Sequence, residues 1–440
     1  MPPAAQARAT ALDLISYIDA SPSPWHAAAN AERRLQAAGF TRLEEGSRWS
    51  LAPGGRYYVV RGGASLIAFV VGHRPLAEAG FRIVGAHTDS PGLRLKPRPA
   101  SAGEGLVRLG VEVYGGPILA TFADRDLGLA GRVVLRTAGG TEARLLDVGR
   151  PLLRLPNLAI HMNREVNEQG LKFDKQTELP LLLGLFGEDE KPEARLRALL
   201  AKAATCEAAD LLSWELAAYD VQPGSLWGAD DEFIASRQLD NLASCHAALS
   251  ALAGVDAVSA VCVAALFDHE EVGSESAAGA GGSFVSDVLA RIAFAAGLDD
   301  EDRHRALANS FFVSADMAHA YHPNFPAAYE PDHKVKVNGG PVIKTNVNQR
   351  YATGAESAAR FMAACDKAGV PCQQYSHRSN LGCGSTIGPI VAARLGIPTV
   401  DVGSPMWAMH SARESAGAED PGYMIGALAA LYASGSCDRS

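Results

Sequence analysis

The sequence lacks the features of several classes of protein. No stretch of about 20 apolar residues is present, so no transmembrane helix is predicted. Residues 1–6 show no charged start followed by an apolar core, and we therefore expect no signal peptide. Lysine and arginine form no basic cluster and the net charge is −9, which argues against a nucleic-acid partner. We expect a soluble, cytoplasmic protein with neither a membrane nor a nucleic-acid partner.

Cysteine is scarce, and its spacing matches neither a disulfide framework nor a thiolate metal site. The number is odd and no two form a CxxC pair: the seven are Cys206, Cys245, Cys262, Cys365, Cys372, Cys383 and Cys437. This argues against a disulfide framework and against a thiolate zinc site, and favours a reducing compartment. The composition is otherwise globular, and 440 residues suit two domains better than one core.

Apolar runs alternate with helical patterns at the two ends of the chain. Residues 5–39 predict two helices separated by a break at 21–24, and strands are predicted over 57–60, 65–71 and 81–85. The pattern returns after residue 232, with strands over 257–267, 311–314 and 399–402 and helices over 242–252, 355–368 and 423–432. These two stretches together are typical of an α/β domain.

The middle of the chain has a different character. Residues 106–114 and 132–136 alternate apolar and polar side chains between glycine-rich turns, as antiparallel strands do, and 192–204 predicts a helix. We therefore predict an α/β domain made of residues 1–92 and 232–440, with a β-rich module of residues 93–231 inserted between its halves.

Potential metal ligands follow the apolar runs of the α/β part. They are His87, the pair Glu270 and Glu271, Asp316, and His410, which comes shortly after the strand that ends near residue 402. Each has an ordinary structural explanation when taken alone. Sites in open α/β sheets form outside the carboxyl ends of the strands, so we expect these segments to converge. Histidine and carboxylate groups suit Zn²⁺, and Mn²⁺ or Co²⁺ can substitute.

A pair of metal ions about 3.5–4 Å apart needs a bridging carboxylate. Asp240 is a good candidate because it begins a predicted helix, where the helix dipole favours an anion. Of the adjacent Glu270 and Glu271, one can bind metal while the other acts as the base that amide hydrolysis requires. Asp89 lies two residues from His87 and can accept the second N–H of that ring.

The motifs around these residues resemble those of the aspartyl aminopeptidases. The matching segments occur in order over nearly the whole chain and include Gly85-Ala-His-Thr-Asp-Ser-Pro-Gly92, Val111-Glu-Val-Tyr-Gly-Gly116, Asp268-His-Glu-Glu-Val-Gly-Ser274, Ser314-Ala-Asp-Met-Ala-His319 and Met409-His-Ser-Ala-Arg-Glu414. The resemblance implies an α/β/α zinc-peptidase domain with a mixed sheet and an inserted β-rich dimerisation domain. It also implies a di-zinc exopeptidase that removes one residue from the N-terminus of a peptide.

The resemblance also implies a role for each residue of the metal site. His87, Asp240 and Asp316 would hold one zinc ion, and Asp240, Glu271 and His410 would hold the other. Glu270 would be the general base acting on a water that bridges the two ions, and Asp89 would support His87.

Substrate and assembly follow from the same resemblance. His319, Lys344 and Tyr351 fall at substrate-binding positions, and His161 would reach the active site of a neighbouring subunit. The family forms a tetrahedral shell of twelve subunits built from dimers. Its name implies a preference for N-terminal Asp or Glu, and Lys344 is a cation that can receive an acidic side chain. Residues 116–123 and 379–383 depart from the family pattern, which leaves the side-chain preference open.

Three other interpretations remain at this point. Cys383 lies in a glycine-rich segment, as the nucleophile of a cysteine hydrolase does, although buried cysteine is commonly just a small apolar residue. A shell-forming protein without activity is a second alternative, and the presence of Glu270 argues against it. A deacylase of amino-acid derivatives is the third, because the same site geometry serves amides generally.

Overall fold

The computed structural model describes residues 4–187 and 191–434, and its largest element is a nine-stranded mixed sheet. The strand order is β1-β2-β3-β13-β4-β14-β18-β16-β17. The strands are β1 (Thr41–Arg42), β2 (Arg56–Arg61), β3 (Ser65–Val70), β4 (Phe81–His87), β13 (Val261–Phe267), β14 (Phe311–Ala315), β16 (Val342–Thr345), β17 (Gln373–Ser376) and β18 (Thr399–Gly403). At the centre β13, β4, β14 and β18 run parallel, so their carboxyl ends meet at one edge.

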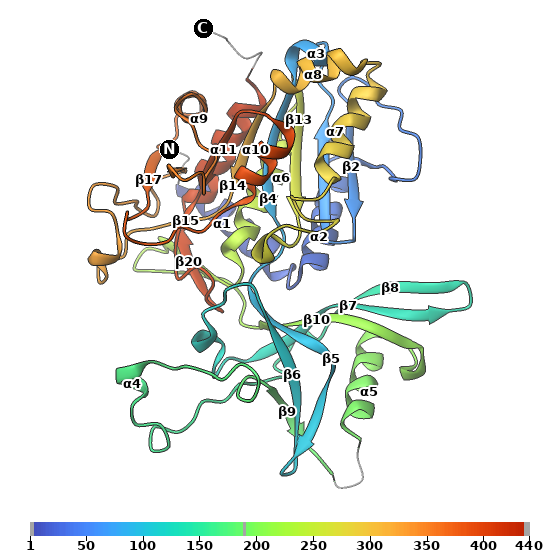
Figure 1. Ribbon diagram of the computed structural model, residues 1–440, viewed down its shortest axis with the longest axis vertical. Coiled ribbons are helices and arrows are strands. Elements are labelled where there is room, and N and C mark those ends of the chain that lie inside the picture. Colours follow the sequence, from blue (N-terminus) through green and yellow to red (C-terminus); the bar gives the residue numbers. More distant parts are fainter. Residues whose placement is uncertain (1–3, 188–190, 435–440) are drawn as a thin grey trace.

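Helices cover both faces of this sheet (Figure 1). One face packs against α1 (Ala4–Asp19), α2 (Pro24–Ala37), α6 (Leu239–Ala253), α9 (Ala355–Ala368) and α11 (Asp420–Tyr432). The other packs against α3 (Leu76–Ala79), α7 (Phe284–Ala295), α8 (Asp300–Ala308) and α10 (Ile387–Leu395). Neighbouring residues such as Ile83 and Val84 enter opposite cores, which explains why the central strands are apolar along their whole length.

A six-stranded antiparallel sheet lies below the large sheet in Figure 1, with its own apolar core and with α5 (Pro192–Ala204) against it. A short helix, α4 (Val166–Gln169), lies in the long connection before β9. The order is β8-β7-β10-β5-β6-β9, formed by β5 (Gly92–Gly103), β6 (Leu106–Tyr114), β7 (Leu127–Thr137), β8 (Gly140–Asp147), β9 (Leu181–Leu185) and β10 (Leu211–Asp220).

A third, five-stranded sheet extends the large body towards the six-stranded one. Its order is β11-β12-β20-β19-β15, formed by β11 (Ser225–Trp227), β12 (Phe233–Ser236), β15 (Ala318–His319), β19 (Pro405–Trp407) and β20 (Glu414–Gly417). β11 comes from the stretch that the sequence assigns to the inserted module, yet it pairs with β12. The division at residues 92 and 232 stays a prediction.

The predicted fold class, a mixed α/β structure with several sheets, is confirmed. The strand expected from residue 257 begins at Val261, because residues 257–260 form no ladder. Within the described part of the chain, six cysteines are free thiols. No helix in that part is long and apolar enough to cross a membrane.

Candidate active site

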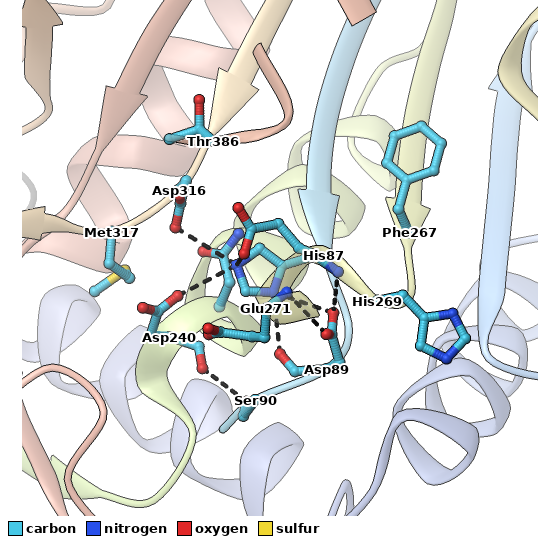
Figure 2. A network of polar contacts seen from close by, with 12 residues as sticks. His87, Asp89, Ser90, Asp240, Phe267, His269, Glu271, Asp316, Met317 and Thr386 are labelled. Atoms are coloured by element: carbon cyan, nitrogen blue, oxygen red, sulfur yellow. Dashed lines mark hydrogen bonds and ion pairs between the residues drawn. The ribbon is translucent and has the colours of Figure 1, made fainter. Parts of the chain in front are cut away.

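The ends of the parallel strands bring most of the predicted ligands together (Figure 2). His87 is the last residue of β4. Glu270 and Glu271 lie in the 3-10 turn that follows β13, and Asp316 follows β14 directly. His410 lies on the loop after β19. Because β13, β4 and β14 are neighbours, residues more than 180 positions apart in the sequence face one another at one edge.

Asp240 completes the group from the beginning of α6. Asp240 lies in the first turn of α6, as expected, but Asp240 and Asn241 have non-helical backbone angles and the peptide bond between them is cis. Hydrogen bonds hold this segment instead. The Asp240 N–H donates to Glu414 Oε2 at 3.1 Å, Ser90 Oγ donates to the Asp240 carbonyl at 2.7 Å, and the Asn241 amide donates to the Ala315 carbonyl at 2.9 Å.

Three groups of these side chains could hold a metal ion: two share Asp240, and the third is His87, Glu270 and Glu271. In the first set, His87 Nε2 lies 3.4 Å from Asp240 Oδ1 and 3.6 Å from Asp316 Oδ1. In the second, His410 Nε2 lies 3.4 Å from both Asp240 Oδ2 and Glu271 Oε1. Each oxygen of Asp240 therefore faces a different histidine, which is the arrangement of a bridging carboxylate.

These spacings fit zinc ligands better than hydrogen bonds. Ligands at about 2.0–2.2 Å from a tetrahedral zinc ion lie about 3.3–3.6 Å from one another, and all four distances fall in that range. An N–H···O hydrogen bond is shorter, about 2.9 Å. In addition, Asp240 Oδ1 and Glu271 Oε1 are buried and accept no hydrogen bond. Buried carboxylate oxygens without donors need another source of positive charge, so the donor set fits a metal pair.

The electrostatics of the cluster lead to the same conclusion. Burial, reinforced by the neighbouring carboxylates of Asp316 and Glu271, raises the pKa of Glu270 to about 9. Burial also raises the pKa of Glu271 to about 7. The pKa of Asp240 is held far below its usual range by His410 and His87, although burial opposes this. Crowded acids of this kind are what divalent cations neutralise, and a bound cation would favour the charged form of each carboxylate.

Asp89 is completely buried beneath the cluster. Its Oδ1 accepts the Glu270 N–H and its Oδ2 accepts the Glu271 N–H, both at 3.1 Å. The closest acceptor for His87 Nδ1 is the backbone carbonyl of Asp89, at 3.0 Å, while the carboxylate Oδ1 lies at 3.5 Å. The sequence therefore placed Asp89 beside His87 but missed that its carboxylate mainly fixes the turn that carries the two glutamates.

A cleft of about 540 Å³ opens over the cluster. The predicted substrate-binding residues His319, Lys344 and Tyr351 all line it, together with the loop 384–386. Lys344 is buried, and its Nζ donates to the carbonyls of Asp316 and Met317 at 3.0 and 3.2 Å. Burial and the charge of Lys344 lower the pKa of His319 to about 4, so this ring is neutral near pH 7. Beside the carboxylates of the cluster, the cleft therefore holds the cation Lys344 and the neutral ring of His319.

His161 is placed differently from the other predicted residues. It is exposed on the loop before α4 and is not among the residues that line the cleft. The side chains of Leu158, Ile160 and Met162 around it are also exposed. Within one chain, this histidine and the cleft stay apart.

Sequence reasoning assigned no role to Glu414 or to Tyr114, which both contact the site. Glu414 Oε1 accepts the backbone N–H of His410 at 2.7 Å, and Tyr114 donates its hydroxyl to Asp89 Oδ2 at 2.7 Å. Both residues lie in segments that carry the family resemblance. Their position in these family motifs was the available signal, because an isolated Glu or Tyr reveals nothing about a contact with a distant residue.

Comparisons with known proteins agree with this geometry. The sequence profile of the family described as Aminopeptidase I zinc metalloprotease (M18) matches residues 17–432. A protein of Stutzerimonas stutzeri (strain A1501) named "Probable M18 family aminopeptidase 2" is 49% identical over 427 residues, which cover 96% of this chain and 97% of that protein.

Solved structures show the same similarity. Ape4, in its complex with Nbr1, is 38% identical with a TM-score of 0.93, over 97% of this chain and 86% of that chain. The S. cerevisiae mApe1 dodecamer is 28% identical with a TM-score of 0.85, over 97% of each chain. The family predicted from the motifs is confirmed, and the match favours a metallopeptidase over a cysteine hydrolase. The chain therefore belongs to the M18 aminopeptidase family, a family of zinc metallopeptidases.

Proposed function

We propose that this aminopeptidase removes the N-terminal residue from peptides with the help of two zinc ions, and that it prefers acidic N-termini. The observation that carries the two-ion site is the position of Asp240, whose two oxygens each lie 3.4 Å from a different histidine. A site for one ion would need only one of these two sets.

His87, Asp240 and Asp316 would hold one zinc ion, and Asp240, Glu271 and His410 the other. Zinc bound there supplies Lewis acidity, which polarises the scissile carbonyl and lowers the pKa of water. Mn²⁺ or Co²⁺ can occupy the same oxygen and nitrogen ligands.

Glu270 is the residue we assign as general base. Its Oε2 lies 3.9 Å from His87 Nε2, farther than the atoms of the two ligand sets, and its side chain faces the cleft. It accepts a proton from the attacking water and then delivers it to the leaving amine nitrogen, so that water is added across the C–N bond. Asp89 supports this role because it anchors the backbone of Glu270.

The preference for an acidic N-terminal residue rests on Lys344. An ammonium group has three donors, and two of them are used by the carbonyls of Asp316 and Met317. The third remains for a substrate carboxylate, because the Asp316 carboxylate lies 3.8 Å from Nζ, beyond hydrogen-bond distance, and His319 and Tyr351 line the same cleft.

We further propose that residues 93–231 form an oligomerisation domain and that the chain assembles into a dodecamer built from dimers, with tetrahedral symmetry. The yeast mApe1 structure is described as a dodecamer, and 97% of this chain aligns with it. The exposed apolar residues Leu158, Ile160 and Met162 suit burial against another subunit. In such an assembly His161 would reach the cleft of a neighbour.

The test is a set of initial rates on aminoacyl-anilides, measured with the purified protein, after dialysis against a chelator, and after zinc is restored. Zinc content is measured in the same samples. We expect about two zinc ions per chain, activity that follows their content, and faster cleavage of Asp and Glu substrates. Activity without metal would refute the proposal. Cleavage of N-acetylated substrates in preference to free ones would favour the deacylase.

A further inference from the structure

Strand β6 of the six-stranded sheet ends beside the metal site. β6 ends at Tyr114, and the next two residues, Gly115 and Gly116, continue towards the cluster. None of the predicted metal ligands comes from this sheet, whose strands span residues 92–220. Its contacts with the site include those of the end of β6 and the residues that follow it: Tyr114, Gly115, Gly116, and Ile118, whose backbone N–H donates to the His410 carbonyl at 2.9 Å.

Tyr114 contacts the site through Asp89. Its hydroxyl donates to Asp89 Oδ2 at 2.7 Å, and the same oxygen accepts the backbone N–H of Glu271. The Tyr114 ring is held by the Arg94 guanidinium, 3.4 Å from its centroid. Tyr114 therefore fixes the carboxylate that in turn fixes the turn of the two glutamates.

The two glycines contact the second ligand set directly. His410 donates its Nδ1–H to the Gly116 carbonyl at 3.1 Å, which leaves Nε2 free for a metal and sets the plane of the ring. Gly115 has φ +66°, and a Cβ placed there would lie 3.1 Å from Glu271 Cβ and 3.3 Å from the Glu271 carbonyl oxygen. The segment therefore needs glycine for its backbone angle and for its close approach to Glu271.

We propose that residues 114–116 are a positioning segment through which the six-stranded sheet orients Glu271 and His410. Together with Asp240, these two residues are the proposed ligands of the second zinc ion. This inference deepens the proposed function and rests on it. The segment makes no covalent or ligand contribution of its own. The zinc affinity of the set Asp240, Glu271 and His410 therefore depends on how the six-stranded sheet packs against the nine-stranded sheet.

The first test compares Tyr114→Phe with Tyr219→Phe. Tyr219 is a matched control, because its hydroxyl also bonds a carboxylate, Asp147 at 2.6 Å, and its ring also lies under an arginine, Arg237. It contacts none of the ligands in the hydrogen bonds of the described residues. We expect Tyr114→Phe to bind zinc about 10- to 100-fold more weakly, measured by competition of the metal-free protein with a chelator, and Tyr219→Phe to match the wild type.

The second test compares Gly115→Ala with Gly105→Ala. Gly105 lies in the turn between β5 and β6 with φ +72°, and an added Cβ meets nothing within 4 Å. Both variants therefore carry similar backbone strain, but only Gly115→Ala pushes on Glu271. We expect Gly115→Ala to retain one zinc ion per chain after mild chelation while Gly105→Ala retains two, and kcat to fall with the lost ion while KM changes little.

The outcomes separate this inference from the function beneath it. If the wild type holds two zinc ions and both test variants hold them as firmly as their controls, the positioning role is wrong and the two-zinc enzyme stands. If the wild type binds no zinc at all, the proposed function fails and this inference fails with it. Circular dichroism of each pair checks that the test variant and its control are folded alike.

Discussion

Glu414 accepts a hydrogen bond of 2.7 Å from the backbone N–H of His410. Its other carboxylate oxygen accepts the backbone N–H of Asp240 at 3.1 Å, and the side chain is buried. One carboxylate therefore sets the spacing of two ligand-bearing backbones that are 170 positions apart in the sequence. Asp89 does the same for the pair of glutamates on the opposite side of the cluster.

Glu414→Gln should weaken metal binding while the protein stays folded. An amide has one acceptor oxygen, so its NH₂ group would face one of the two backbone N–H donors that the carboxylate now accepts. Asp240 and His410 would lose their fixed spacing, and we expect zinc affinity to fall about 10- to 100-fold. Zinc content measured after dialysis against graded chelator concentrations checks this.

Glu419→Gln is the control for that measurement. Glu419 lies near the start of α11, and its carboxylate accepts the Tyr423 hydroxyl at 2.6 Å. The change is the same replacement of a carboxyl group by an amide, but Glu419 bonds no ligand backbone in the hydrogen bonds of the described residues. Equal zinc retention by the two variants would show that Glu414 has no positioning role.

Glu270→Gln should separate catalysis from metal binding. The amide cannot take a proton from water, so kcat should fall about 10²- to 10⁴-fold while both zinc ions remain. Asp240→Asn is the contrasting variant, because each oxygen of Asp240 faces a different histidine, and its loss should release metal from both positions. Steady-state rates and zinc content are measured on the same preparations.

A different result for each variant would contradict the role assigned to Glu270 or to Asp240. Nearly full activity of Glu270→Gln would mean that another group is the base. Two tightly held zinc ions in Asp240→Asn would mean that Asp240 does not bridge them.

The fold and the outline of the site could be predicted because they depend on local patterns. The predicted strands over 81–85, 257–267 and 311–314 correspond to β4, β13 and β14, and polar side chains shortly after them marked the edge where parallel strands end. The rule that a site forms at that edge brought His87 and Asp316 together without any knowledge of strand order.

The supporting contacts could not be predicted in the same way. Tyr114 meets Asp89 from another sheet, and Glu414 meets Asp240 across 174 positions. Hydrophobic periodicity reports whether a residue is buried, not which distant residue it contacts. The non-helical backbone at Asp240, just before the predicted helix over 242–252, could not be predicted either, because it is held by hydrogen bonds with Ser90 and Glu414, which are distant in the sequence.

Lys344→Met should abolish a preference for acidic N-termini. Methionine has a similar length but no charge, so a substrate carboxylate would lose its charged partner. A hydrogen bond to a charged group contributes about 1.5–3 kcal/mol, and the ratio of kcat/KM for Asp over Leu substrates should therefore fall about 10- to 100-fold.

The leucyl substrate is the internal control for Lys344→Met. The lysine also anchors the carbonyls of Asp316 and Met317, and loss of these bonds would slow every substrate equally. Only the ratio of kcat/KM for Asp over Leu substrates reports recognition of the substrate's N-terminal side chain. An unchanged ratio in zinc-loaded protein would show that another group reads the N-terminal residue.

A pH-dependent contribution to stability is expected outside the cleft, at Asp13 on α1. Its carboxylate accepts His246 Nε2 at 2.7 Å and both Arg34 nitrogens at 2.9 and 3.0 Å. These partners, His246 first, hold the pKa of Asp13 well below its usual value, although burial opposes them. The side chain is 52% exposed, so solvent weakens the effect.

Asp13→Asn should therefore destabilise the protein most at neutral pH. Because the folded pKa of Asp13 lies below the unfolded value of about 3.9, its stabilisation is complete above that value and is lost as the pH falls through the folded one. Urea denaturation at pH 7, 4, 3 and 2 should show the wild type and the variant converging below pH 4. Asp256→Asn is the control, since Asp256 is fully exposed and 3.9 Å from Arg56, and it should change nothing at any pH. A gap between wild type and Asp13→Asn that stays constant from pH 7 to pH 2 would mean that packing, rather than the charge of Asp13, supplies the stabilisation.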